Sequence, residues 1–288
     1  EDDTIDANDG DDVIDAGAGD DTITGGAGAD TITGGAGDDT FSITDLTDST
    51  TVDTDVITDF TTGDDELRTT ITLPAAGGEF DFTNQGSAAS VFEGQVLLSG
   101  VAGQSFFNTS TNQLIVDTDG NGLIQASDFA VTLTGVTEIA ASDLAFDVTT
   151  VAGNADDSIT TAGGADKFIV AAALNGGADL DFNAGAGDDV LDINTTGAVT
   201  FAAGTLAGFE TLDLDATGTN SDLTITAAQF NAFDTITANG DDAITITTMN
   251  GVDTTASAAD DTFVFGAGEG GATIASFTTN DVLNLDAR

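Results

Sequence analysis

A nine-residue period runs through the first 42 residues and constrains the fold more than any other feature of the chain. An aspartate stands at the sixth position of each unit and an apolar residue follows it by two, while a glycine stands two residues before every one of these aspartates after the first. So short a period predicts a stack of like supersecondary units rather than one globular core. The periodic aspartates are Asp3, Asp12, Asp21, Asp30 and Asp39, and the apolar residues are Ile5, Ile14, Ile23, Ile32 and Phe41.

Each unit is interpreted as a six-residue turn followed by a very short strand. Glycine adopts positive φ without steric cost and lets turn carbonyls approach a common centre. The apolar residue points to one face because side chains alternate along a strand. Two units, or 18 residues, then complete one coil. We therefore expect Asp3, Asp21 and Asp39 to stack along one edge and Asp12 and Asp30 along the other.

The charge balance predicts that this stack binds cations. The chain carries 51 acidic and 3 basic residues, a formal net charge of -48, although 40% of its residues are apolar. Such an apolar content favours a folded chain, but like charges oppose a compact state unless counter-charges are bound within it. Calcium accepts about six to eight oxygen ligands in flexible geometry, so Ca²⁺ is the predicted ion. The alternative is a metal-free array of turns rich in Asp and Gly.

These units resemble the repeats-in-toxin (RTX) family, whose nonapeptide G-G-x-G-x-D-x-U-x forms a calcium-binding parallel β-roll. Residues 25–33 and 34–42 match every fixed position, whereas Ala16, Ala7 and Asn8 depart from the glycines in the two earlier units. The resemblance implies calcium held between stacked turns by the sixth-position aspartates and turn carbonyls. It also implies type I secretion, with an uncleaved carboxy-terminal signal expected beyond Arg288. The chain starts within a repeat and shows no amino-terminal signal, so we expect a piece of a longer protein.

One segment of the sequence occurs twice, each time after an expected strand of sequence "DDTF". "VDTDVITDFTTGDDEL" at 52–67 and "GGATIASFTTNDVLNL" at 270–285 each come after a "DDTF" strand. The segment resembles the one that closes repeat blocks in the RTX family, so a capping role is expected. Asp59 and Asp65 are candidate additional ligands, although Ser276 replaces the first of them in the second copy.

The middle of the chain contains a second type of candidate site, in "VDTDGNGLIQASDF". Its residues occupy positions 1, 3, 5, 7 and 12 of a calcium loop, with Gly122 at position 6 where a sharp turn is required. The flanking residues alternate like strands rather than helices, so a strand–loop–strand site is predicted. A plain Asp-Gly hairpin is the alternative. The candidate ligands are Asp117, Asp119, Asn121, Leu123 and Asp128.

The nonapeptide persists in decayed form between 151 and 265, which predicts a second, less regular β-solenoid. Its aspartates are either metal ligands or solvated turn residues, because the glycine pattern is broken. Thr-Ile-Thr segments at 22–24, 31–33, 224–226, 235–237 and 245–247 raise ice binding as a remote alternative, although threonine is also simply a good strand residue. The candidate ligands are Asp157, Asp166, Asp189, Asp242 and Asp261.

Composition argues against catalysis within this chain. It contains no His, Cys, Trp or Tyr, so the common nucleophile–base pairs, zinc sites and sugar-stacking aromatics are absent from the sequence. Its single lysine, Lys167, is expected to face solvent. No basic stripe suits nucleic acid and no apolar run suits a membrane span, so neither partner is expected.

Together these features predict an all-β chain of parallel β-roll or β-solenoid blocks. We expect a calcium-binding roll with a closing cap at 1–67, a β-rich strand–loop module at 68–150, and a degenerate roll with a cap at 151–288. The predicted function is a secreted, calcium-dependent structural protein at the cell surface, a surface-layer or filament subunit. The expected partners are identical subunits and, as a further candidate, cell-surface polysaccharide. The alternatives are a spacer or adhesive region of a large adhesin, or the non-catalytic region of a secreted enzyme or toxin.

Overall fold

The structure is a computed structural model of the 288-residue chain. It describes residues 1–72, 79–82, 84–150, 158–161, 163–171, 174–175, 181–195, 198–201, 204–214, 222–230, 232–237, 243–247, 254–255, 260–265, 274–275 and 282–285. The fold is nearly all β, as predicted. The chain divides into two compact units: unit 1 comprises Glu1–Ile71, Glu79–Asp147 and Thr160–Asp166, and unit 2 comprises Thr72–Gly78, Val148–Ile159 and Lys167–Arg288.

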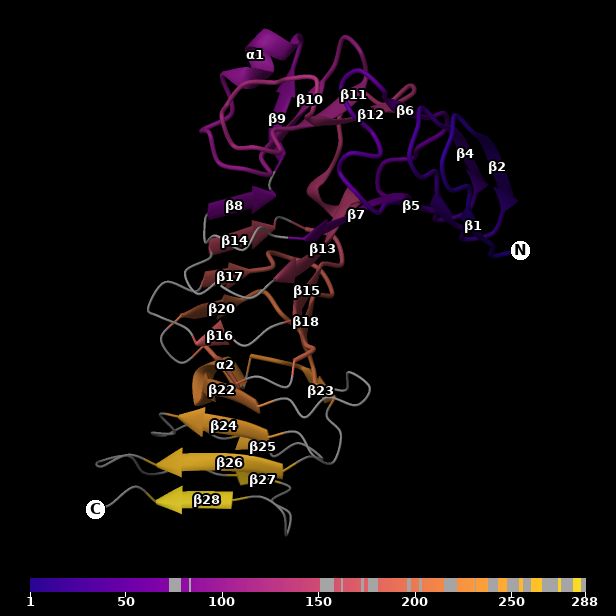
Figure 1. Ribbon diagram of the computed structural model, residues 1–288. Helices are drawn as coiled ribbons and strands as arrows, with labels where there is room; N and C mark the ends of the chain where they lie inside the picture. Colours follow the sequence, from indigo (N-terminus) through magenta and orange to yellow (C-terminus); the bar gives the residue numbers. More distant parts are fainter. Residues whose placement is uncertain are drawn as a thin grey trace. The chain divides into compact units, whose positions relative to one another are not determined.

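Unit 1 begins as a roll in which short parallel strands alternate between two sheets (Figure 1). Each coil takes 18 residues at first, because Thr4 pairs with Thr22 and Thr22 with Thr40 in one sheet, while Val13 pairs with Thr31 in the other. To the first sheet this part of the chain contributes β1 (Thr4–Asp6), β3 (Thr22–Thr24), β5 (Thr40–Ile43), β7 (Glu66–Thr72) and β13 (Leu144–Thr150), in that order. The second sheet is ordered β2 (Val13–Ala18), β4 (Thr31–Ala36), β6 (Asp55–Ile57), β12 (Phe129–Leu133), β11 (Gln113–Val116), β10 (Ser105–Asn108) and β9 (Asn84–Ala88).

The core of the roll consists of two columns of apolar side chains between the sheets. The periodic apolar residues stack in register, with Ile23 opposite Phe41 in one sheet and Ile14 opposite Ile32 in the other. Beyond the repeats, Leu67 and Ile57 continue the two columns. These side chains are almost fully buried, and each contributes roughly 1.5–3 kcal/mol of hydrophobic stabilisation. The columns therefore explain why an aliphatic or aromatic residue recurs every nine positions.

The strand–loop–strand module of unit 1 is joined to the roll through its second sheet. β11 and β12 form an antiparallel hairpin around the loop at 117–128, and β12 pairs in parallel with β6. The strands of this module carry an apolar cluster of their own, formed by Ala88, Phe106, Ile115 and Ala130. The remaining elements of unit 1 are β8 (Glu79–Phe82), helix α1 (Val91–Gln95) and a 3-10 turn at Ala141–Asp143.

This arrangement overturns the capping role expected for 52–67. β6 lies between β4 and β12, and β7 lies between β5 and β13, so neither strand covers an open end of a sheet. The duplicated pairing itself is present: Phe41 lies opposite Leu67, and Phe263 lies opposite Leu283 in the second copy. The strands of the first copy thus extend the solenoid rather than terminate it. The three predicted domain boundaries stay predictions.

Unit 2 is a solenoid of parallel strands with less regular coil lengths. In one sheet Phe168, Leu191 and Leu212 form a fully buried column, and in another Val199, Leu223 and Ile244 do so. β24, β26 and β28 are successive arrows in Figure 1. The Phe168 column belongs to a run of strands ordered β15 (Lys167–Val170), β18 (Val190–Ile193), β21 (Thr211–Asp213) and β23 (Thr235–Thr237). The Val199 column belongs to a six-stranded sheet ordered β16 (Leu174–Asn175), β19 (Ala198–Thr200), β22 (Asp222–Thr226), β24 (Ala243–Thr247), β26 (Asp260–Phe265) and β28 (Val282–Leu285). The other elements are β14 (Ser158–Thr161), the pair β17 (Asp181–Asn183) and β20 (Thr205–Ala207), the pair β25 (Thr254–Thr255) and β27 (Ile274–Ala275), and helix α2 (Ala227–Phe230).

Threonines also align across unit 2. Thr200, Thr224, Thr245 and Thr262 occupy matching register positions on β19, β22, β24 and β26. By contrast, the Thr-Ile-Thr segments at 22–24 and 31–33 lie in different sheets. β-Branched residues suit the pleated surface of a strand, so strand propensity accounts for the aligned threonines. Among the described residues, no helix is long and apolar enough to cross a membrane.

Candidate metal sites

The sixth-position aspartates form two ladders, one along each edge of the roll. In each ladder a carboxylate accepts the backbone N–H of the rung one coil earlier. Asp21, Asp39 and Asp65 accept from Asp3, Asp21 and Asp39 at 2.7, 2.9 and 2.9 Å. Asp30 and Asp55 accept from Asp12 and Asp30 at 2.8 and 2.9 Å. We call Asp3, Asp21, Asp39 and Asp65 the first ladder and Asp12, Asp30 and Asp55 the second ladder.

Two rungs lie outside the nine-residue period. The sequence predicts Asp65 only as an additional ligand and does not single out Asp55. An insertion lengthens the coil, so these rungs follow the preceding ones by 26 and 25 residues instead of 18. The signal that could have found them is the pattern of an aspartate followed two positions later by an apolar residue, here Leu67 and Ile57.

Several rungs have one oxygen without a partner. Oδ2 is buried and makes no hydrogen bond in Asp12, Asp21, Asp30 and Asp55, and in the last three Oδ1 accepts the N–H of the preceding rung. Asp21, Asp30 and Asp55 are each 1% exposed. A buried ionised oxygen without a compensating partner is costly, so these atoms require a proton or a cation. The same requirement arises in both ladders.

The glycines of the repeat keep the space beside the rungs open. A Cβ on Gly25 would overlap Oδ2 of Asp30, and a Cβ on Gly34 would overlap Oδ2 of Asp39. At the second repeat position, a Cβ on Gly26 would overlap the carbonyl oxygen of Asn8, which lies one coil earlier. The turn backbone and the carboxylate therefore converge on a space that excludes any side chain. Carbonyl and carboxylate oxygens from successive coils line this space.

The electrostatics of the ladders also favour a bound cation. Burial, opposed by the ladder hydrogen bonds and reinforced by neighbouring carboxylates, raises the pKa of Asp30, Asp39 and Asp65. The same causes raise the pKa of Asp55 to about 7. Of the described basic side chains, Arg68 pairs with Glu66 and Asp147 and Lys167 pairs with Asp192, so neither neutralises a ladder.

The donor set fits calcium. All donors are oxygens, and calcium accepts about six to eight of them in irregular geometry. The sequence has no histidine or cysteine, which zinc sites commonly use. Asp59, the other additional candidate, is engaged differently: its two oxygens accept the N–H groups of Gly34 and Gly35 at 3.0 and 2.9 Å. It thus holds the turn rather than offering an unpartnered oxygen.

The loop between β11 and β12 gathers three of its five predicted ligands. Carboxylate oxygens of Asp117, Asp119 and Asp128 lie within 4.8 Å of one another. Asp117 accepts the N–H groups of Gly120 and Gly122 at 2.9 and 2.7 Å, and burial raises its pKa. The strand–loop–strand flanks agree with the prediction.

The other two predicted ligands of this loop are placed differently. The Oδ1 of Asn121 accepts the N–H of Leu123 at 2.7 Å, and its amide donates to Asp119 at 2.7 Å. The hydrocarbon side chain of Leu123 has no ligand atom and is exposed, so this residue can bind calcium only through its backbone carbonyl. The candidate site in this loop is therefore a cluster of three carboxylates.

Further along the chain, acidic residues again precede strands. Asp166, Asp189 and Glu210 stand immediately before β15, β18 and β21. Within unit 1, Asp166 accepts the N–H of Phe146 at 2.7 Å; within unit 2, Glu210 accepts the N–H of Asp189 at 2.9 Å. Glu210 is not among the predicted residues, because a glutamate does not fit the nonapeptide. The ladder hydrogen bond thus survives where the glycine pattern has decayed.

Three predicted ligands in this region cannot be placed in a site. Asp157 and Asp242 lie outside the described residues. Asp261 lies within β26 opposite Ile244 instead of in a turn. Lys167 is expected to face solvent; its side chain is partly exposed, but its Nζ contacts Oδ2 of Asp192 at 2.7 Å. That ion pair stabilises neighbouring strands without a metal.

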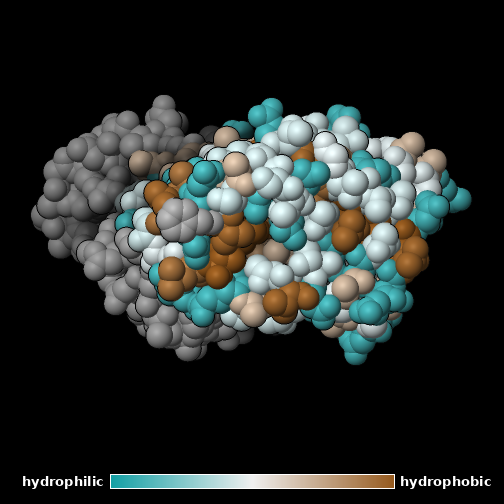
Figure 2. Space-filling model, turned by 90° about the horizontal axis from the view of Figure 1, so that it is seen from above, coloured by the Kyte–Doolittle hydropathy of each residue, from teal (hydrophilic) through white to brown (hydrophobic). Residues whose placement is uncertain are grey.

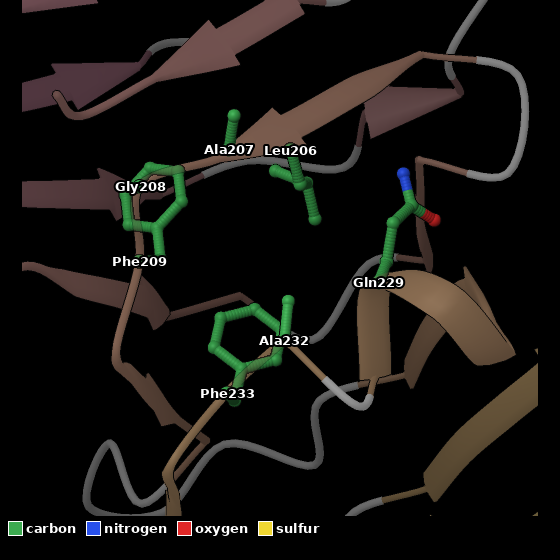
Figure 3. A pocket seen from close by; sticks show the side chains of 7 residues that line it. All are labelled: Leu206, Ala207, Gly208, Phe209, Gln229, Ala232 and Phe233. Carbon is green, nitrogen blue, oxygen red and sulfur yellow. The ribbon is translucent and has the colours of Figure 1, made fainter.

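A small apolar pocket lies in unit 2 beside α2 (Figure 3). Gln229 is a polar residue at its rim, and its amide donates to the carbonyls of Phe201 and Gly204 at 3.0 and 3.1 Å. That amide is engaged with the backbone, so the pocket offers no catalytic arrangement. Its lining residues are Leu206, Ala207, Gly208, Phe209, Gln229, Ala232 and Phe233.

Comparison with known proteins agrees with this geometry. Residues 8–146 match a family model described as peptidase M10 serralysin C terminal. The matched part runs from the second repeat to β13 and includes most of both ladders and the loop at 117–128. No curated protein matches the chain. Residues 8–146 therefore form a calcium-binding repeat domain of the RTX type, and Ca²⁺ is its cofactor.

Proposed function

We propose that this chain is part of a secreted structural protein, a surface-layer or filament subunit, that folds and assembles when it binds calcium outside the cell. The observation that carries this proposal is the row of buried, unpartnered carboxylate oxygens in the two ladders. Without a cation these oxygens repel one another in a low-dielectric interior, so the folded state is disfavoured.

Folding is then coupled to metal binding. The sites exist only when successive coils are stacked, so the free energy of calcium binding contributes directly to folding. Inside a cell, where free calcium is scarce, a chain of charge -48 stays expanded, which suits type I secretion. Outside, a dissociation constant of about 10⁻⁴ to 10⁻³ M, typical of extracellular calcium modules, places the transition at the surrounding calcium concentration.

One surface feature supports self-assembly. The face in Figure 2 shows separate hydrophobic patches among hydrophilic and neutral residues. Exposed valines at Val13, Val52 and Val96 are apolar contact points on the described surface. Cell-surface polysaccharide is a further proposed partner.

A second candidate function follows from the family match. The matched model is described as the carboxy-terminal part of a peptidase, so this chain can instead be the non-catalytic region of a secreted enzyme. In that role it would assist export and folding of a catalytic domain elsewhere in the protein.

Size-exclusion chromatography with light scattering, first in chelator and then in millimolar calcium, tests these functions. A smaller hydrodynamic radius together with a multiple of the 28.6 kDa chain mass supports the structural subunit. A smaller radius at monomer mass favours the enzyme region or an adhesin spacer. If neither the hydrodynamic radius nor the mass changes when calcium is added, calcium-dependent folding itself is overturned.

A further inference from the structure

Most of the exposed large hydrophobic side chains of unit 1 lie on the strand–loop–strand module or on a segment that touches it. Leu123 lies within the loop at 117–128 and is 59% exposed. Val52 follows Thr51, which is bonded to this loop. The N–H of Thr51 donates to the carbonyl of Asp128 at 3.0 Å, and its hydroxyl donates to the carbonyl of Gln125 at 2.7 Å. We call these exposed residues the loop patch: Val52, Val91, Val96, Leu97 and Leu123.

The segment that carries Val96 and Leu97 also packs against the loop at 117–128. A Cβ on Gly120 would overlap the backbone nitrogen of Ala102, so the two segments are in close contact. Val96 is 74% exposed and Leu97 is 39% exposed, although both precede this contact by only a few residues. Exposed aliphatic side chains therefore come from segments on either side of one contact.

Other residues of the same segments supply the packing of the module. Leu98 and Ile124 pack against its apolar cluster. The residues directly before them, Leu97 and Leu123, are exposed. α1 lies on the side of Figure 1 from which Figure 2 is viewed, and hydrophobic patches are visible there between hydrophilic residues. Exposed apolar patches with polar borders mark surfaces that contact another molecule or a membrane.

The candidate calcium site of the loop adjoins the loop patch. Asp119 is the exposed member of the cluster with Asp117 and Asp128, so an ion held by these carboxylates lies at the protein surface. Calcium takes about six to eight oxygens. Three carboxylates, each binding through one oxygen, and the carbonyl of Leu123 leave positions open to oxygens of another molecule. The exposed side chain of Leu123 thus lies on the same loop as a cation that can bind an external anion.

We propose that the loop patch and the calcium ion of the loop at 117–128 together attach the protein to an anionic lipid surface. Calcium bridges the loop carboxylates and the headgroup phosphates, and the aliphatic side chains enter the boundary between headgroups and acyl chains. Charge complementarity depends on the ion, because a chain of net charge -48 is otherwise repelled by anionic lipid. This attachment rests on the proposed calcium-dependent folding and adds to it the partner that holds the protein at the cell surface.

A lipid surface fits these residues better than a second copy of the chain does. Only Val91 of the loop patch lies in a helix and the others lie in loops, so they form no continuous strand or helix face. A stable protein interface needs a closely packed, complementary core, whereas fluid lipid surrounds separate side chains. Contact of this kind needs no membrane-spanning segment. Val52 and Val96 are then lipid contacts, and Val13 is left as a contact point between copies.

The test is sedimentation of the full 288-residue chain with lipid vesicles, in millimolar calcium and in chelator. The vesicles contain equal parts of phosphatidylcholine and phosphatidylglycerol, and vesicles of phosphatidylcholine alone show whether anionic headgroups are needed. The variants are Leu97→Ser and Leu123→Ser, which keep every carboxylate and backbone carbonyl of the loop. Val13→Ser is the matched control, since Val13 is 86% exposed on β2, outside the loop patch.

We expect the unaltered chain to sediment with the anionic vesicles in calcium and not in chelator. Leu97→Ser and Leu123→Ser should each weaken this binding by about threefold or more, and the double variant by about tenfold, because apolar area is lost from the lipid contact. Val13→Ser should bind vesicles as the unaltered chain does. Calorimetric titration with calcium chloride should give the same calcium affinity for all of these proteins.

Equal vesicle binding by Val13→Ser and both test variants would show that the loop patch does not contact lipid. If the test variants bind vesicles normally but form fewer multimers in light scattering, the loop patch joins two copies instead. An unaltered chain that compacts in calcium without binding anionic vesicles would overturn the lipid contact alone. Failure of the unaltered chain to compact in calcium would instead overturn the proposed function.

Discussion

The backbone N–H of Asp21 donates to Oδ1 of Asp39 at 2.9 Å, 18 residues along the chain, and the Asp21 carboxylate in turn accepts the N–H of Asp3. This relationship makes each aspartate both a rung and a support for the rung before it. One oxygen maintains the spacing of the coils, and the other is available to a cation. Structural and metal-binding roles are therefore combined in one side chain.

Asp21→Asn separates the two roles. The amide oxygen can still accept the N–H of Asp3, but the charge is lost. We expect the calcium concentration at the folding midpoint to rise about tenfold, or roughly 1.4 kcal/mol. The calcium-free chain should become slightly more compact, because one buried charge is removed. Calcium titration followed by circular dichroism gives the midpoint, and the hydrodynamic radius in chelator gives the compaction. Asp38→Asn removes an exposed charge nearby and is the control; equal behaviour of the two variants contradicts the ladder.

Close packing of successive coils is tested at Gly26. Its φ is +98°, and a Cβ would overlap the carbonyl oxygen of Asn8. Gly10 has φ +124°, but a Cβ there would meet no atom within 4 Å, so Gly10→Ala reports backbone strain alone. Both substitutions should lower the melting temperature in calcium, with strain costing about 1–3 kcal/mol. Gly26→Ala should cost clearly more and should also reduce calcium affinity. Equal melting temperatures would show that coil contact is unimportant there.

Features of the fold that depend on neighbouring residues could be predicted from the sequence, whereas features that depend on distant residues could not. The coil length, the apolar columns and the paired edges are predictable because every nine residues repeat the same local chemistry, as in Ile23 opposite Phe41. Asp55 escapes prediction because an insertion separates it from Asp30 by 25 residues, although Ile57 two positions later preserves the local pattern. Periodicity is thus informative only while coil length is constant.

Contacts between segments that are far apart in the chain cannot be predicted from the sequence. The segment containing β6 and β7 is expected to close the roll, but β12 and β13 pair with these strands from far along the chain. Likewise, nothing local to Lys167 indicates that Asp192 approaches it. Whether a strand is an edge or an interior strand depends on which remote segment supplies its neighbour. The residues around a strand carry little of that information.

Protonation of the ladder aspartates at low pH should stabilise the fold in part as calcium binding does. The folded-state pKa of Asp55 is raised to about 7, and those of Asp30, Asp39 and Asp65 are raised as well. Between its ordinary pKa of 3.8 and about 7, Asp55 binds a proton in the folded but not in the unfolded chain. The stability of the calcium-free fold therefore decreases as pH rises through this window, by about 1.4 kcal/mol per pH unit for each such proton.

Calcium binding has the opposite dependence on pH, since the ion displaces these protons and binds more tightly as pH rises towards about 7. In metal-free buffer, the hydrodynamic radius should be smaller at about pH 5.5 than at about pH 8, because ordinary carboxylates are ionised at both values. Asp55→Asn should reduce this difference. A chain that is more compact at the higher pH without calcium would contradict the assignment of raised pKa values.

The loop at 117–128 is tested through Asp119, the exposed member of its carboxylate cluster. We expect Asp119→Asn to weaken one calcium site by about tenfold or more while the hairpin stays folded, because Asp117 and Asp128 retain their backbone hydrogen bonds. Calorimetric titration gives the affinity. Glu138→Gln, which also removes an exposed negative charge, is the control. Unchanged binding in Asp119→Asn would favour a plain hairpin.

Arg68 provides a contact that is independent of metal. Its guanidinium donates to Glu66 at 3.1 Å, to Asp147 at 2.7 Å and to the carbonyl of Ala165 at 2.9 Å, all within unit 1. Arg68→Gln should destabilise the protein by about 1–2 kcal/mol, because hydrogen bonds to charged groups are lost at a partly buried site. Arg68→Lys should recover only part of this, since lysine lacks the planar fork.

The loss of stability in the Arg68 variants should not depend on calcium, which distinguishes Arg68 from the ladder aspartates. Because the guanidinium replaces no calcium ligand, denaturant unfolding at two saturating calcium concentrations should give the same loss of stability, and the number of bound ions should be unchanged. A variant that instead lost a calcium ion would show that β7 and β13 depend on the metal and that the ion pair does not hold them together by itself.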